Sequence, residues 1–146
     1  MIYVVEPLVK KAYEVEKEAV SSYFDGLAKI RGQGLRYEDV EKVIKRIAID
    51  TIVHKHLMKA IMDAQEEIRK LGELETREED IPEERKALIK RFAEIHLEIE
   101  KNMIETYEKM AEKMTHPLFK GLAKALMENE REHHKMLKEL IDRYSL

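Results

Sequence analysis

A carboxylate and an imidazole stand three residues apart near the end of the chain, at Glu130 and His133. Apolar residues flank this pair at the distance of one helical turn, with Met127 before it and Leu137 after it. Positions i and i+3 share one face of a helix, so the spacing turns both polar groups toward the apolar side. Burying them is costly unless they are paired or bind a metal ion. The pair therefore predicts metal binding, provided that other helices bring partners to it.

Four segments with apolar residues at helical spacing predict the elements that position this pair. We expect helices over about residues 7–30, 39–71, 82–114 and 117–144, separated by breaks that contain Gly or Pro. The polar stretch over residues 73–80 is expected to be a solvated loop. Short connections make neighbouring helices antiparallel, so the predicted fold is all-α, an up-down-up-down four-helix bundle forming a single domain over residues 1–146.

The two halves of the chain resemble each other, which indicates a duplicated helical hairpin. Residues 16–23 match residues 100–107 and share the Glu, Lys and Tyr positions. Residues 54–63 match residues 133–142, with His at the first position and Asp at the last. Chance similarity between Lys- and Glu-rich helices is the competing explanation, but it does not predict equal spacing of the polar residues on the apolar faces.

Counting residues from the loops places several of these polar residues at one height. At roughly 1.5 Å of rise per residue, Glu16 and His54 both lie about 22 Å from the loop that joins their helices, and the second half repeats this arrangement. Carboxylates that cluster in a dry core repel each other and take up protons or a cation. We therefore predict that one buried cavity is lined by five metal ligands, which are Glu16, His54, Glu100, Glu130 and His133.

Glu on two helices, with Glu-x-x-His on their partners, is a ligand pattern of dinuclear carboxylate proteins. The chain resembles the ferritin-like superfamily in this respect, and in particular single-domain rubrerythrin-like proteins without a rubredoxin module. The resemblance implies that Glu16 and Glu100 are terminal carboxylates, that Glu130 bridges, and that His54 and His133 are the imidazole ligands. It also implies one or two iron or manganese ions per chain, reaction with peroxide, dioxygen or ferrous iron, and an external electron donor. A homodimer is compatible with it.

The second predicted helix departs from the family pattern at Thr51, where the repeat places the other bridging Glu. A Thr hydroxyl is a poor ligand for iron or manganese at neutral pH. Asp50 lies four residues before His54 and shares its face, so it is a further candidate that could bind one metal, bind through water or hydrogen-bond His54. We therefore expect unequal metal positions, with the tighter one beside Glu130 and His133.

One further ligand candidate and two classes of function stay open. His96 could orient Glu100 or add a ligand, although packing beside Phe92 also explains it. The first class of function is an oxidoreductase with a dinuclear centre. The second is a bundle with a single-metal or empty site that serves as a non-enzymatic scaffold or interaction module, which Thr51 favours.

Composition excludes several other classes. The chain has 146 residues and no Cys, which excludes disulfides, thiolate metal sites and Cys nucleophiles. Its net charge of −3 comes from well-mixed acidic and basic residues without a basic stripe, so nucleic acid is not an expected partner. No apolar run is long enough to span a membrane, and the first residues do not resemble a signal peptide, so we expect a cytoplasmic protein. Abundant Lys and Glu with few Asn and Gln is typical of thermophiles.

Overall fold

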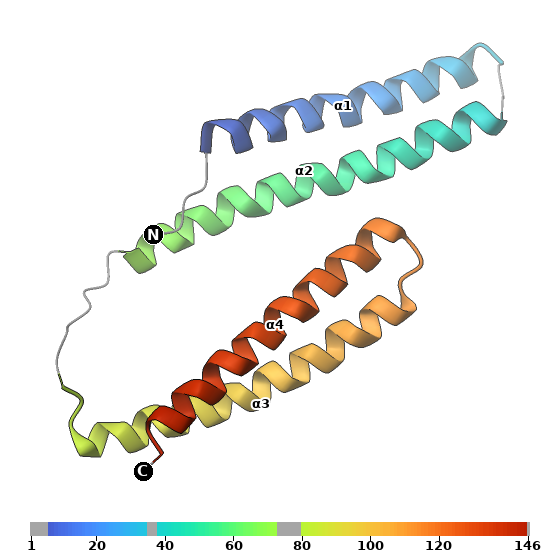
Figure 1. The fold of residues 1–146 in the computed structure, drawn as a ribbon. Coiled ribbons are helices and arrows are strands. Elements are labelled where there is room, and N and C mark those ends of the chain that lie inside the picture. Colours follow the sequence, from blue (N-terminus) through green and yellow to red (C-terminus); the bar gives the residue numbers. More distant parts are fainter. Residues whose placement is uncertain (1–5, 35–37, 73–79, 146) are drawn as a thin grey trace. The chain divides into compact units, whose positions relative to one another are not determined.

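The computed structural model describes residues 6–34, 38–72 and 80–145, and within these ranges the chain forms four α-helices and no strand. The helices are α1 (Glu6–Gly32), α2 (Glu38–Gly72), α3 (Glu83–Lys113) and α4 (Pro117–Arg143) (Figure 1). The all-α fold is confirmed, and every predicted helix boundary agrees with the observed one to within two residues. The predicted loop over 73–80 lies outside the described residues, apart from Asp80.

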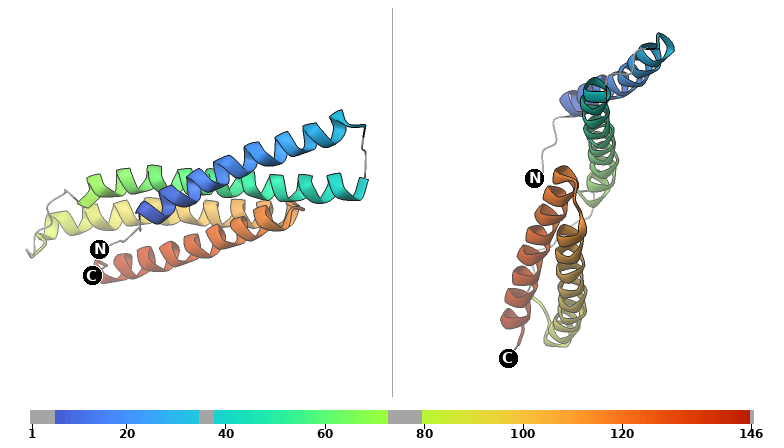
Figure 2. Two further views of the ribbon diagram at one scale, coloured as in Figure 1. Left: turned by 90° about the horizontal axis from the view of Figure 1, so that it is seen from above. Right: turned by 90° about the vertical axis from the view of Figure 1, so that its right-hand side faces the viewer.

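The helices pair in chain order into two antiparallel hairpins, α1 with α2 and α3 with α4 (Figures 1 and 2). The hairpins belong to two compact units, Met1–Thr76 and Arg77–Leu146. The antiparallel pairing expected within each hairpin is confirmed. That both hairpins form a single domain stays a prediction. None of the four helices contains an apolar stretch long and uncharged enough to cross a bilayer.

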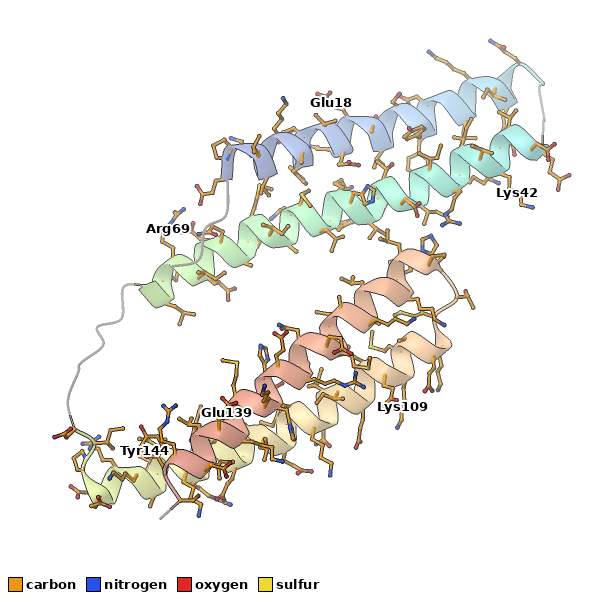
Figure 3. The ribbon with its side chains drawn as sticks, viewed as in Figure 1. Glu18, Lys42, Arg69, Lys109, Glu139 and Tyr144 are labelled. Carbon is orange, nitrogen blue, oxygen red and sulfur yellow. The ribbon has the colours of Figure 1, made fainter. Side chains whose placement is uncertain are left out.

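Ion pairs join the two helices of the first hairpin at both ends in its observed register. At the turn, the guanidinium of Arg31 on α1 donates to both carboxylate oxygens of Glu41 on α2, at 3.0 and 3.1 Å. That hydrogen bond raises the pKa of Arg31 further above its usual value. At the open end, Arg69 of α2 pairs with Glu6 in the first turn of α1 (Figure 3). The chain reverses direction after α1 through Gly34, whose positive φ of 74° suits glycine. This register fixes which residues of α1 and α2 face each other.

Small residues line the contact between the helices of the second hairpin. Ala93 and Ala111 on α3 and Ala123 on α4 are all buried. A methyl side chain lets two helix backbones approach closely, so the longer polar side chains between these alanines are held near one another. At the start of α4, the Nδ1 atom of His116 accepts a hydrogen bond from the backbone of Leu118 at 3.2 Å and caps the helix. These contacts position the ligand candidates of α3 and α4.

Candidate metal centre

Three of the predicted ligands come together in the second hairpin. Glu100 lies on α3, and Glu130 and His133 lie one turn apart on α4. The Nδ1 atom of His133 is 3.7 Å from a carboxylate oxygen of Glu100 and 3.7 Å from one of Glu130. One donor atom from each residue lies within 4.8 Å of the others, and this is the only such group of three found in the described parts of the chain.

One oxygen of the Glu100 carboxylate lacks a hydrogen-bond partner. This Oε2 atom is buried and accepts no hydrogen bond from any residue that the structure describes. The 3.7 Å separation from His133 is too long for such a bond. Buried carboxylate oxygens are normally paired, because an unmet acceptor loses the hydration it had in water. The position of this oxygen beside a second carboxylate and an imidazole fits a bound cation.

The chemistry of the donor set also fits a transition metal. At ligand distances of about 2.0 to 2.2 Å, two donors on one ion lie roughly 3 to 4 Å apart. The observed separations between His133 and the two carboxylates fall in that range, and small side-chain adjustments bring in the remaining pair. Two carboxylates neutralise a divalent charge, and the mixed oxygen and nitrogen set suits iron, manganese or zinc. The group is therefore chemically able to hold one such ion.

The first hairpin repeats part of this arrangement. The Nδ1 atom of His54 on α2 lies 3.7 Å from a carboxylate oxygen of Glu16 on α1, the same separation as between His133 and Glu100. The internal repeat detected in the sequence therefore reproduces the contact between a glutamate and a histidine in both hairpins. The pair is more exposed than Glu100 and Glu130, since the side chain of Glu16 is 29% exposed and that of His54 is 48% exposed.

The remaining candidates of α2 are engaged elsewhere. Thr51 is only 6% exposed, and its hydroxyl donates to the backbone carbonyl of Ile47 at 2.8 Å. A carboxylate oxygen of Asp50 lies 3.5 Å from the guanidinium of Arg46, one turn earlier. Asp50 does not join Glu16 and His54 in a three-donor group among the described residues. The pairing of Asp50 with Arg46 was not predicted from the sequence, although a basic residue four positions earlier on a helix is a usable signal.

A mostly apolar pocket of about 260 Å³ opens beside the three-donor group. It is lined by Glu100 and His133 together with Phe92, His96, Met136 and Leu137. The rings of Phe92 and His96 lie 4.3 Å apart between centroids, which confirms the expected packing of His96 beside Phe92. The imidazole of His96 does not belong to the group of mutually close donors. The sequence could not predict the pocket, because it depends on how side chains of α3 and α4 meet.

Comparison with known proteins identifies the class. The family model described as Rubrerythrin matches residues 8–141, which is nearly the whole chain. The chain therefore belongs to the rubrerythrin family, and the ferritin-like, all-α four-helix fold class predicted from the sequence is confirmed. This membership makes it a ferritin-like metal-binding protein. No curated protein and no solved structure shows a significant match to the chain.

Proposed function

We propose that this protein is an oxidoreductase that uses bound iron or manganese to act on peroxide, on dioxygen or on ferrous iron. The observation that carries the proposal is the group formed by Glu100, Glu130 and His133, in which one buried carboxylate oxygen accepts no hydrogen bond. Membership of the rubrerythrin family supports the choice of metal and of reaction. A bound iron or manganese ion would supply a redox couple and open coordination positions for the oxidant.

Each residue of the ligand set has a defined task in this proposal. The carboxylates of Glu100 and Glu130 neutralise the charge of the metal, and the imidazole of His133 adds a neutral donor. The five-residue ligand set expected from the sequence, which adds Glu16 and His54, remains our proposal for the complete centre. Contacts within each hairpin support it, because the same glutamate–histidine separation of 3.7 Å occurs in both.

The pocket beside the group would shape access to the metal. Its walls are mainly the apolar side chains of Phe92, Met136 and Leu137, so it favours small uncharged molecules over ions. Hydrogen peroxide and dioxygen fit that description. Reducing one peroxide to two waters takes up two electrons and two protons. Because the chain has no Cys to hold an iron–sulfur or rubredoxin centre, we propose that an external donor delivers the electrons.

Metal analysis followed by an activity assay tests the proposal. The protein is produced in medium with iron or manganese, and the metal content of the purified chain is measured. The reduced protein is then mixed with hydrogen peroxide, or with ferrous iron in air, and compared with the same concentration of free metal. We expect bound metal and faster turnover than free metal gives. In Glu130→Ala the metal should be lost, whereas Glu98→Ala, on an exposed part of α3, should keep it.

A second candidate function follows from the first hairpin. The hydroxyl of Thr51 is bonded within its own helix, so α2 offers no bridging carboxylate at that position. A centre with one metal would then support a structural role as a scaffold or interaction module. A metal-loaded protein that is inert toward both oxidants would favour this function over the first. Location in the cytoplasm and the formation of a homodimer stay predictions.

A further inference from the structure

We propose that the two hairpins bind metal unequally, with one tight position at Glu100, Glu130 and His133 and a weak position at Glu16 and His54. This inference rests on the proposed metal binding and adds to it which half of the chain controls the stoichiometry. When metal is limiting, each chain should therefore bind one ion, and residues of α3 and α4 should hold it.

The internal repeat supplies the comparison between the hairpins. Glu16 corresponds to Glu100 and His54 to His133, and each corresponding pair has the same 3.7 Å separation. The hairpins differ at the residue three positions before the histidine. That residue is Glu130 in α4 and Thr51 in α2. The first hairpin therefore contributes one carboxylate where the second contributes two, so its own residues alone do not neutralise a divalent ion.

The structure also shows why Thr51 does not replace the missing carboxylate. Its hydroxyl donates to the carbonyl of Ile47, and its side chain is buried in a helix whose neighbouring small residue, Ala48, is buried as well. Turning the hydroxyl toward a metal would break that hydrogen bond in a place with little access to water. A neutral hydroxyl would also leave the charge of the ion unchanged. Thr51 is thus a helix-packing residue and not a ligand.

Asp50 does not provide the missing carboxylate either. It starts one position away on the helix from Thr51, and its carboxylate lies 3.5 Å from Arg46. Binding a metal would require Asp50 to leave this cationic partner and to lose the attraction between the two side chains. The pairing with Arg46 therefore competes with a role for Asp50 as a metal ligand beside His54.

Titration of Mn²⁺ into the metal-free full chain tests the inference. The signal of free Mn²⁺ in electron paramagnetic resonance reports binding directly and does not depend on turnover. We expect one tight equivalent and a second that binds at least about 10- to 100-fold more weakly, since even disturbing a group outside the ligand sphere costs that much affinity. His133→Ala should remove the tight equivalent, and His54→Ala should remove only the weak one.

Two substitutions at Thr51 separate ligand chemistry from packing. Thr51→Glu should tighten the weak position by about 10- to 100-fold, because it restores a carboxylate three residues before His54. Thr51→Val keeps the shape of the side chain but removes the hydroxyl, and it should leave both affinities unchanged. Circular dichroism checks that each variant is folded. If Thr51→Glu does not fold, the variants His133→Ala and His54→Ala still show which hairpin holds the tight equivalent.

The outcomes distinguish the inference from the function on which it rests. Two equally tight equivalents in the unmodified chain, or loss of metal in Thr51→Val, would overturn the asymmetry while leaving metal binding intact. Loss of the tight equivalent in His54→Ala would show that the first hairpin holds the tightly bound ion, and it would also overturn the inference. Absence of any Mn²⁺ or Fe²⁺ binding by the unmodified chain would instead refute the proposed function.

Discussion

Replacing Glu130 with Gln should change stability in opposite directions with and without metal. Gln keeps the size of the side chain but removes its negative charge. In the metal-free protein, the charges of Glu130 and Glu100 face each other with donor atoms no more than 4.8 Å apart. Two unit charges at that separation repel by roughly 0.9 kcal/mol in the dielectric of water and by roughly 3.5 kcal/mol at an effective dielectric of 20.

Partial exposure and the nearby imidazole place the expected effect near the lower of these values. Both carboxylate side chains are 18% exposed, and His133 lies 3.7 Å from each. We expect metal-free Glu130→Gln to be more stable than the unmodified protein by about 1 kcal/mol. With metal the order reverses. At a free metal concentration 100 times Kd, binding stabilises the unmodified protein by about 2.7 kcal/mol, whereas a variant with a 100-fold higher Kd is stabilised by only about 0.4 kcal/mol.

Urea unfolding followed by circular dichroism measures both effects. The unmodified chain, Glu130→Gln and the control Glu98→Gln are unfolded in the presence of a chelator and again with Mn²⁺ in excess. The control changes an exposed carboxylate of α3 that does not belong to the three-donor group, and it should behave like the unmodified chain in both conditions. If Glu130→Gln is destabilised without metal, or is stabilised by metal as much as the unmodified chain, the reasoning from facing carboxylates is refuted.

Three further substitutions test the packing and the ion pairs. Arg46→Gln frees Asp50 from its cationic neighbour and should tighten the weak metal position, measured by Mn²⁺ titration; an unchanged affinity would show that Asp50 is not restrained by charge. Ala123→Leu inserts volume into the buried contact of the second hairpin and should cost about 1 to 3 kcal/mol in urea unfolding, whereas Ala125→Leu at an exposed position should cost much less. Arg31→Ala removes a pair whose arginine side chain is 51% exposed, so the loss of stability should be small and should shrink further in high salt; a large, salt-independent loss would contradict a surface pair.

Residue spacing was enough to predict the elements and part of the centre. Apolar periodicity with Pro and Gly at the breaks located all four helices, because these residues act locally on the backbone. Counting from the turns also predicted which residues meet within a hairpin. Glu100 lies against His133 and Glu16 against His54, because an antiparallel pair with a short turn leaves little freedom in register.

Side-chain choices were harder to predict from spacing. Asp50 shares a helix face with both His54 and Arg46, and only the structure shows the short approach to Arg46. His96 shares a face with both Glu100 and Phe92, and its ring packs against Phe92. In each case two neighbours one turn away compete for one side chain, and small energy differences among rotamers decide the contact. Helical periodicity describes the face of a residue but not its rotamer.

Thr51 stands at the position of the repeat where the second hairpin has Glu130, so the two hairpins should depend on metal to different degrees. Thr51 satisfies its hydroxyl within α2, so the first hairpin carries no unmet charge at that position when metal is absent. The second hairpin keeps two facing carboxylates and a buried oxygen without a hydrogen bond, and these groups favour a bound cation. Metal should therefore stabilise α3 and α4 more than α1 and α2. Hydrogen exchange with and without Mn²⁺ should show the larger gain in protection around Glu100 and His133, and an equal gain around His54 would mean that both hairpins depend on the metal alike.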